Sequence, residues 1–377
     1  MALPSAYSLL DPFPWYQQMR HASPVVRDPS TGLWMVFSYE DVQRTLSDWK
    51  RFSSQQGRPR GEQAQSPLSS SMISTDPPRH RQIRTLVEQA FTPRQVRALA
   101  PRIEVLVDEL LGAAEKHGQM DFIQEFAYPL PVIVIAEILG IPATDRDAFK
   151  RWSDAVVTGD PHGSREMAAY FSTLIEQRRH DLGEDLISGL ITAQVEGEHL
   201  DAQELVGFCM LLLVAGNETT TNLLANTVLS WQDAPAAYDA VVQDPALLPT
   251  TIEESLRYRS PVQSMYRFTT EDVELSGQRI PANSPVLAWI GSANRDEAQF
   301  AQAQTFDPAR TPNRHLAFGN GVHFCLGAPL ARLEATLALT AVLERLPNLR
   351  VAPNAVLTPI QSQIVSGVKA LPVTFGP

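Results

Sequence analysis

The stretch that decides the fold of this chain reads Phe318-Gly319-Asn320-Gly321-Val322-His323-Phe324-Cys325-Leu326-Gly327. It is a glycine-punctuated loop that ends in a cysteine, and a long helical pattern follows at residues 326–346. Backbone N–H groups at a helix start favour a thiolate, and glycines let the backbone approach a flat ligand closely. A single thiolate cannot build a tetrahedral zinc site, but it can be the axial ligand of a haem iron. The alternative is a buried structural cysteine, which leaves the other residues of the stretch without a reason.

A second motif precedes this loop, in the predicted helix over residues 248–258. Glu254 and Arg257 are three residues apart and therefore share one helix face. A planar guanidinium can bridge two carboxylate or carbonyl partners at once. We therefore predict a structural role for this pair; the family resemblance described below implies that Arg310, in Phe306-Asp307-Pro308-Ala309-Arg310, is the third member of the network and that the network holds the irregular loop in place. The alternative is an exposed helix pair, which contributes only about a few tenths of a kcal/mol.

The longest helical pattern runs from Asp201, with Glu204 placed for a capping box, to about residue 231. Its middle reads Ala215-Gly216-Asn217-Glu218-Thr219-Thr220-Thr221, in which glycine, polar residues and threonines are poor helix formers. Two explanations remain open at this point. A threonine hydroxyl bonds a carbonyl one turn back and bends the helix, or the segment forms a groove that faces a ligand.

Taken together, these motifs resemble those of the cytochrome P450 family, in the same order along the chain. The resemblance covers residues 11–375 and is closest to short bacterial and archaeal members, including a thermophilic archaeal type. It implies a mainly α fold with minor β, an α-rich triangular prism with a long central helix over the haem and a small β region. It also implies that haem b (iron protoporphyrin IX) is bound through Cys325. The further residues that the family's motifs place at this cofactor are Ala215, Gly216, Phe318, Gly319, His323 and Gly327.

The resemblance also implies an activity. It predicts a haem-thiolate monooxygenase that inserts one oxygen atom from O2 into an apolar small-to-medium organic substrate. Glu218 and Thr219 match the family's acid–alcohol pair, in which a carboxylate relays protons and a hydroxyl holds a hydrogen bond. Two alternatives remain: a peroxide-driven haem-thiolate peroxygenase and a non-catalytic haem-thiolate binding protein. The intact acid–alcohol pair favours the monooxygenase.

The family layout places two further groups of residues. The cations expected at the haem propionates are His80, Arg84, Arg267 and His323. The residues expected to line the substrate pocket are Ser69, Met72, Ile73, Val214, Val262, Met265, Ile364 and Val365.

Composition limits the remaining possibilities. The chain has 377 residues, 31 Lys and Arg against 42 Asp and Glu, and a net charge of −11, so a nucleic-acid partner is not expected. Its two cysteines, Cys209 and Cys325, exclude a disulfide scaffold, and Cys209 is expected to pack in the core. Apolar runs stay well below the about 20 residues of a membrane span, and no signal peptide is evident. We expect a cytoplasmic protein without a membrane contact.

The sequence also makes a prediction about electron supply. We expect one cytochrome P450 domain over residues 1–377, with no fused reductase or ferredoxin domain. Electrons are therefore expected from a ferredoxin-type or flavodoxin-type donor with its reductase. Residues 79–102 hold six arginines against the single acid Glu88, which predicts a basic patch that steers an acidic partner.

Apolar periodicity and breaker residues predict the individual elements. Strands are expected in a hairpin over 24–26 and 33–37, in short pieces over 262–289 and in the tail 348–377, with a long loop at 53–74. The expected helices are 11–20, 78–90, 93–117, 122–139, 145–157, 164–180, 184–196, 201–231, 248–258 and 326–346.

Overall fold

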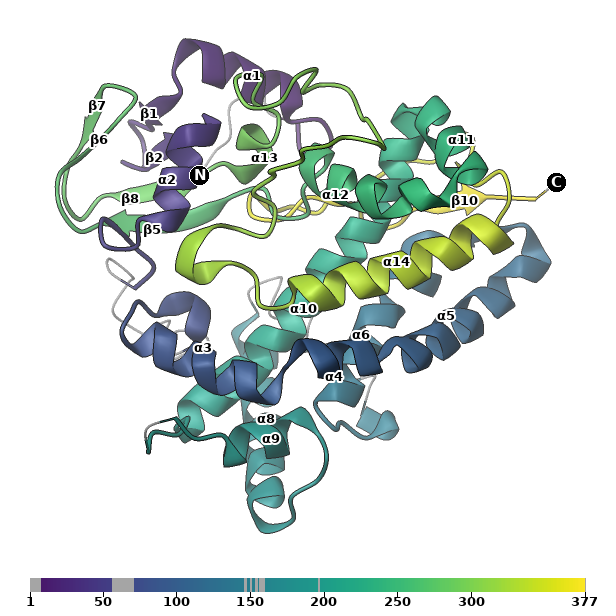
Figure 1. Cartoon of the computed structure of the whole chain (residues 1–377), viewed down its shortest axis with the longest axis horizontal. Coiled ribbons are helices and arrows are strands. Elements are labelled where there is room, and N and C mark those ends of the chain that lie inside the picture. Colours follow the sequence, from purple (N-terminus) through teal and green to yellow (C-terminus); the bar gives the residue numbers. More distant parts are fainter. Residues whose placement is uncertain are drawn as a thin grey trace. The chain divides into compact units, whose positions relative to one another are not determined.

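The computed structural model describes residues 8–55, 71–145, 148–149, 151–152, 155, 160–195 and 197–376. Helices dominate these residues and strands are short, which confirms the expected mainly α class with minor β (Figure 1). The helices are α1 (Phe13–Ala22), α2 (Tyr39–Ser47), α3 (Arg79–Ala90), α4 (Pro93–Ala98), α5 (Ala100–Ala114), α6 (Pro129–Ile138), α8 (Pro161–His180), α9 (Leu186–Thr192), α10 (Ala202–Asp233), α11 (Pro235–Gln243), α12 (Leu248–Tyr258), α13 (Ile290–Ala293) and α14 (Ala328–Arg345). The strands are β1 (Val25–Arg27), β2 (Trp34–Val36), β3 (Phe52–Ser53), β4 (Gln119–Asp121), β5 (Met265–Thr269), β6 (Val273–Leu275), β7 (Gln278–Ile280), β8 (Pro285–Ala288), β9 (Arg350–Val351) and β10 (Pro372–Thr374).

The chain divides into two compact units. Unit 1 takes Met1–Gly57, Glu104–Ala127 and Thr219–Pro377, and unit 2 takes Arg58–Ile103 and Tyr128–Glu218. Helix α10 belongs to both, because the boundary falls inside it.

Unit 1 contains the β structure. Its larger sheet has the strand order β1-β2-β8-β5-β3, in which β2 and β8 are parallel and the other neighbours antiparallel. The predicted hairpin of β1 and β2 is confirmed, with Val25 opposite Val36. Alternate residues of these strands are buried with side chains of α2 and α13, since successive strand side chains point to opposite faces. In the same unit, α12 packs against α14.

Unit 2 is helical, and α9 packs against both α3 and α8. Helices α6 and α10 approach closely at Gly216, where a Cβ atom would lie 2.8 Å from Cδ1 of Ile135. A larger residue here would require the end of the Ile135 side chain to move, so the close packing of α6 and α10 favours a small residue at position 216.

The long helix α10 follows its prediction closely. Asp201 and Glu204 form the expected capping box, since the Glu204 amide donates to Asp201 at 2.8 Å and the Asp201 amide donates to Glu204 at 3.0 Å. The helix continues without interruption through residues 215–221, although these residues are poor helix formers. Tertiary packing overrides their intrinsic propensity.

Two expected helices are divided in the structure. The segment 93–117 is broken between α4 and α5, and 122–139 is divided into a π-helical turn (Ile123–Ala127) and α6. Pro101 and Pro129 stand in the first turns of α5 and α6, where proline begins a helix and cannot continue one. The expected helix 145–157 lies partly outside the described residues. None of the helices that the structure describes is long and apolar enough to cross a bilayer.

Candidate functional site

The cysteine loop, residues 318–325, lies in unit 1 directly before α14. Gly319 and Gly321 have φ values of +75° and +73°, which favour glycine. At Gly321 a Cβ atom would also lie 2.8 Å from Cα of Ser47 in α2, so α2 approaches the loop too closely for a side chain. The Cys325 amide donates to the Phe318 carbonyl at 2.8 Å and closes the loop. The sequence thus folds here into a tight turn that presents a thiol beside a helix start.

The two cysteines have different environments. Cys209 is fully buried in α10, and burial raises the pKa of its thiol well above the usual range. Cys325 is only half-buried. Among the described residues no three His, Cys, Asp or Glu side chains form a metal site. A single accessible sulfur at a helix start fits axial ligation of haem and does not fit zinc.

The network around Glu254 lies in unit 1 and is centred on a completely buried ion pair. The side chains of Glu254 and Arg257 both have 0% exposure, and Arg257 donates to the carboxylate at 2.8 and 2.7 Å. Arg257 also donates to the carbonyls of Asn294, Ala303 and Thr305 at 2.8 to 3.0 Å. One guanidinium therefore ties α12 to the irregular segment after α13.

Arg310 lies in the same network, beside the residues with which the sequence motif groups it. Its Nε donates to both Glu254 oxygens at 3.1 and 3.0 Å, and Nη1 donates to the Ala301 carbonyl at 2.8 Å. Two further donors were not expected from the sequence: the Asp307 amide at 2.9 Å and the Asn313 side chain at 3.2 Å. A buried carboxylate thus has its charge and its hydrogen-bonding capacity satisfied together.

A second network, which the sequence motifs did not indicate, surrounds the neighbouring Glu253. Arg332 donates to Glu253 in a bidentate pair at 2.7 and 2.8 Å, and His315 Nε2 lies 3.1 Å from the same carboxylate. Partial burial alone would raise the pKa of Glu253, but the hydrogen bonds from Arg332 and His315 outweigh it and lower the pKa to about 2. Glu253 is therefore ionised at neutral pH.

The acid–alcohol residues are consecutive on α10, Glu218 in unit 2 and Thr219 in unit 1. Both side chains are half-buried, whereas Ala215 is exposed and Asn217 is fully buried. The hydroxyl of the nearby Thr221 donates to the Ala127 carbonyl, 94 residues away, at 3.1 Å. The catalytic assignment of Glu218 and Thr219 stays a prediction.

The four residues expected at the haem propionates divide between the units. In unit 2, His80 is buried on α3, and Arg84 forms an ion pair with Glu88 at 2.8 Å. In unit 1, Arg267 is buried on β5 and donates to the Tyr266 carbonyl at 2.7 Å. His323 Nε2 lies 3.1 Å from the Ser54 hydroxyl, so this ring is oriented by a residue near β3.

The expected pocket residues also divide between the units. In unit 1, Val262 and Val365 form a β-bridge, and the Gln263 amide donates to the Ile364 carbonyl at 2.7 Å, close to Met265 on β5. Unit 2 holds the other described members, the buried Met72, the exposed Ile73 and the half-buried Val214. Ser69 lies outside the described residues.

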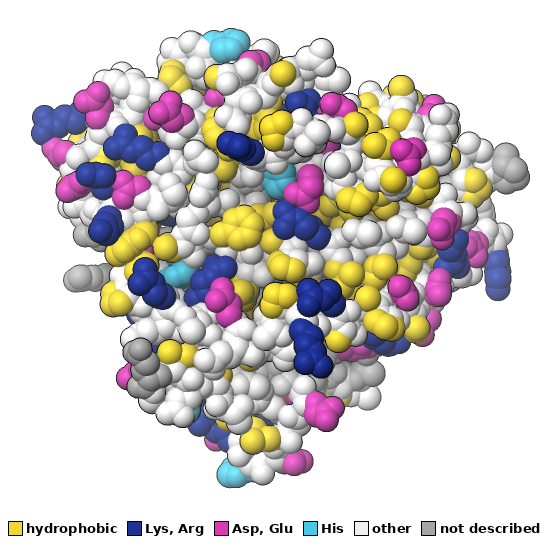
Figure 2. Space-filling view, viewed as in Figure 1, with side chains coloured by type: hydrophobic (Ala, Val, Ile, Leu, Met, Phe, Trp, Pro, Cys, Tyr) yellow, Lys and Arg dark blue, Asp and Glu magenta, His cyan; other side chains and the backbone are white. Residues whose placement is uncertain are grey.

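The basic patch expected over residues 79–102 is smaller than the arginine count suggests. Arg79 is paired with Glu204 at 2.7 Å, Arg84 with Glu88, and Arg102 with Glu137 at 2.8 Å. Carboxylates distant in the sequence therefore neutralise part of the charge. Arginines that are exposed and that no ion pair in the described part of the chain engages are Arg81, Arg94 and Arg97. Figure 2 shows Lys and Arg side chains over the region where Figure 1 draws α4.

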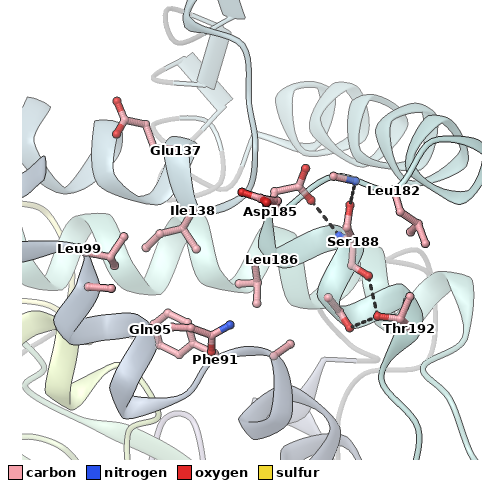
Figure 3. Close-up of a pocket in the computed structure, with 15 residues that line it drawn as sticks. Phe91, Gln95, Leu99, Glu137, Ile138, Leu182, Asp185, Leu186, Ser188 and Thr192 are labelled. Atoms are coloured by element: carbon pink, nitrogen blue, oxygen red, sulfur yellow. Dashed lines mark hydrogen bonds between the residues drawn. The ribbon is translucent and has the colours of Figure 1, made fainter.

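A cavity of about 560 Å³ lies within unit 2, away from every residue expected at the cofactor. Figure 3 shows its apolar lining, which includes Phe91, Leu99 and Ile138, beside the carboxylates of Glu137 and Asp185. Both carboxylates already have partners, because Arg102 pairs with Glu137 and Arg178 pairs with Asp185. The charges of these two carboxylates are therefore already neutralised within unit 2.

Comparison with known proteins agrees with this geometry. Residues 162–369 match the family model described as Cytochrome P450. The chain is 42% identical to putative cytochrome P450 YjiB of Bacillus subtilis, covering 96% of this chain and 93% of that protein. It is 41% identical to the erythromycin C-12 hydroxylase of Saccharopolyspora erythraea, covering 98% and 95%.

A crystal structure of CYP109E1 from Bacillus megaterium in complex with testosterone has the same fold. The TM-score is 0.93 at 41% identity, with coverage of 98% of this chain and 99% of that chain. The likeness confirms the fold that the motifs predicted around Cys325, Glu254 and Arg257. The chain belongs to the cytochrome P450 family.

Proposed function

We propose that Cys325 is the axial ligand of the haem b in this cytochrome P450 monooxygenase, and that the enzyme hydroxylates an apolar small-to-medium substrate. The observation that carries the assignment is the position of Cys325, half-buried at the start of α14 on a loop shaped by two left-handed glycines. Amides at this helix start stabilise a thiolate, whereas burial keeps the Cys209 thiol protonated. Bound haem supplies the iron centre at which dioxygen is reduced and the substrate is oxidised.

The chain's own residues would manage protons beside that centre. We assign the Thr219 hydroxyl to a hydrogen bond that holds oxygen or water, and the Glu218 carboxylate to proton transfer from solvent. Both side chains are half-buried, so each can reach a ligand and solvent. The continuous helix fixes the two side chains at adjacent positions on α10.

The propionates of haem are anions and require donors. We assign them to His80 and Arg84 in unit 2 and to Arg267 and His323 in unit 1. Arg267 supports this assignment, since it is a cation on a short strand of unit 1 and is only 5% exposed. Buried charges require charged or hydrogen-bonding partners, and a propionate is an anion of matching charge.

The substrate class follows from relatives and from the pocket residues. One relative is named for hydroxylating erythromycin at C-12, and another was crystallised with testosterone. The side chains expected to contact substrate are almost all apolar, among them Met72, Val214, Val262 and Met265. Apolar walls select C–H-rich molecules because burial of apolar surface provides the binding free energy.

For electron supply we propose an acidic redox protein, of the ferredoxin or flavodoxin type, that docks beside α3 and α4 of unit 2. The exposed Arg81, Arg94 and Arg97 provide the complementary charge. Arg79 and Arg102 are excluded from this role because carboxylates of the same unit pair with them.

The ligand assignment is tested by two serine variants. Reduced, carbon-monoxide-bound wild-type protein should show the red-shifted Soret band of thiolate ligation. Cys325→Ser should lose that band, and Cys209→Ser, the matched control, should keep it. The opposite pattern, with the band retained in Cys325→Ser and lost in Cys209→Ser, would show that Cys209 is the ligand.

The proton-transfer assignment is tested by coupling. With saturating substrate and supplied redox partners, Thr219→Ala should still consume NADH but divert it to peroxide. Glu218→Gln should slow oxygen turnover, because a carboxamide cannot relay protons. Coupling in Thr219→Ala equal to that of wild type would disprove the role of the hydroxyl and leave a helix-bending role. Wild-type rates of product formation with hydrogen peroxide alone would favour the peroxygenase alternative.

A further inference from the structure

Three residues tie the cysteine loop to α12 from both sides. His315 lies three residues before Phe318, Arg332 lies seven residues after Cys325, and both bind Glu253. The carboxylate is 29% exposed, the histidine 4% and the arginine 39%, so the group is sheltered without being closed from solvent. All of these residues belong to unit 1.

The arginine also contacts the loop directly. Its guanidinium carbon lies 4.5 Å from the centroid of the Phe318 ring, a cation–π geometry. Phe318 is the residue whose carbonyl accepts the Cys325 amide at 2.8 Å. Arg332 therefore packs on the residue that closes the turn around the sulfur.

Hydrogen bonds orient the ring of His315. The Ala317 amide donates to Nδ1 at 3.3 Å, and Nε2 lies 3.1 Å from the Glu253 carboxylate. His315, Arg332 and Glu253 therefore form one hydrogen-bonded cluster that connects the cysteine loop to α12.

The positive charge of Arg332 lies beside the cysteine loop, because its guanidinium packs on the Phe318 ring and the Phe318 carbonyl accepts the Cys325 amide. The hydrogen bonds to Glu253 raise the pKa of this guanidinium against partial burial, so Arg332 stays protonated. The bidentate bond to Glu253 prevents Arg332 from swinging away into solvent.

We propose that Arg332, held by Glu253 and His315, is a positioning residue that fixes the cysteine loop and sets the reduction potential of the haem by placing a positive charge near the thiolate. The proposal rests on Cys325 as the axial ligand. A nearby cation favours the reduced state and a nearby carboxylate opposes it, so the two partners have opposite effects.

The test is a spectroelectrochemical titration of the haem-loaded protein. Arg332→Gln should shift the ferric–ferrous equilibrium roughly threefold to tenfold toward ferric, and Glu253→Gln should shift it by a similar factor toward ferrous. Arg332→Lys, which keeps the charge, should remain near wild type. The matched control is Arg345→Gln on the same helix. Arg345 pairs with the surface residues Asp108 and Glu115, so this variant should leave the ferric–ferrous equilibrium unchanged.

Opposite shifts of the reduction potential in Arg332→Gln and Glu253→Gln support the proposal. A purely structural role would shift the potential of both variants in the same direction or leave both unchanged. Equal or same-sign shifts overturn it, and so does a shift in Arg345→Gln as large as that in Arg332→Gln. If Arg332→Gln does not fold, Glu253→Gln still decides the proposal: a shift toward ferrous supports it, and no shift or a shift toward ferric overturns it. A wild-type carbon-monoxide spectrum without the thiolate band would overturn the Cys325 assignment itself, which the potentials do not test.

Discussion

Helix α12 carries two consecutive glutamates with opposite surroundings. Glu254 is completely buried with Arg257 and Arg310 and has no access to solvent. Glu253, one residue earlier, is 29% exposed and binds Arg332 and His315. The first network connects α12 to backbone carbonyls of the segment after α13, and the second connects it to both sides of the cysteine loop.

The difference shows how one helix can supply both rigidity and adjustable charge. Inside the protein an unpaired charge is costly, so breaking the Glu254–Arg257 pair should destabilise the fold strongly. The Glu253 network is partly open to water, which screens its charges, so loss of one member should cost less stability while it changes the local potential. The following predictions test this comparison, beginning with the largest effect.

Removal of Arg257 should have the largest effect. Arg257→Ala leaves the buried Glu254 without its bidentate partner and three carbonyls without donors, a loss of about 3–5 kcal/mol. The free energy of unfolding from urea titration, together with the yield of haem-containing protein, measures the loss. Unchanged melting and haem content would show that the network is not structural.

Removal of Arg310 should have an intermediate effect. Arg310→Ala leaves Glu254 paired with Arg257, so the expected loss is about 1–3 kcal/mol. The same urea titration measures it. If Arg310→Ala were as damaging as Arg257→Ala, the two arginines would act as one unit, and the double variant should then be no worse than either.

Neutralisation of Glu253 should have a smaller effect that depends on pH. Hydrogen bonds lower the pKa of Glu253 from its ordinary 4.5 to about 2, so its ionised form stabilises the fold above pH 4.5. Glu253→Gln should therefore lose about 1–2 kcal/mol at neutral pH. The difference from wild type should shrink as the pH falls from about 4.5 to about 2. A difference in unfolding free energy that stays constant over this range would contradict the pairing.

Removal of Arg345 should have the smallest effect on stability and serves as the reference for the other variants. Its ion pairs with Asp108 and Glu115 lie at the surface of unit 1, and such pairs contribute about 0–1 kcal/mol. Arg345→Ala should melt close to wild type at moderate salt, as measured by thermal unfolding. A loss as large as that of Arg257→Ala would remove the distinction between buried and exposed networks.

Sequence reasoning was strongest where one motif spans one element. The bounds of α12 and the capping box of α10 agree with their predictions, because caps and apolar spacing act within a few residues. Helix α2 was missed, although Ser38 caps it and its buried residues follow helical spacing. Helix α2 has only nine residues and lies between strands, so its apolar spacing is too short to indicate a helix clearly.

Partners that are distant in the chain could not be read from the sequence. The sequence places Arg79 and Arg102 in a basic patch, but in the structure Glu204 pairs with Arg79 and Glu137 pairs with Arg102. His315 belongs to none of the sequence motifs, but its side chain is buried against Glu253, 62 residues away. No local pattern marks such a pair, because the fold and not the spacing brings the two side chains together.

Because the two cysteines differ in reactivity, thiol labelling should report how many molecules contain haem. The Cys209 thiol is buried and held protonated, so it is inert toward alkylating reagents, whereas Cys325 is half-buried at a helix start. If Cys325 is the axial ligand proposed above, neither thiol reacts while haem is bound, and each molecule that loses haem exposes one reactive sulfur. Counting labelled thiols by mass spectrometry would therefore give the fraction of haem-free chains directly, without reference to an absorption coefficient.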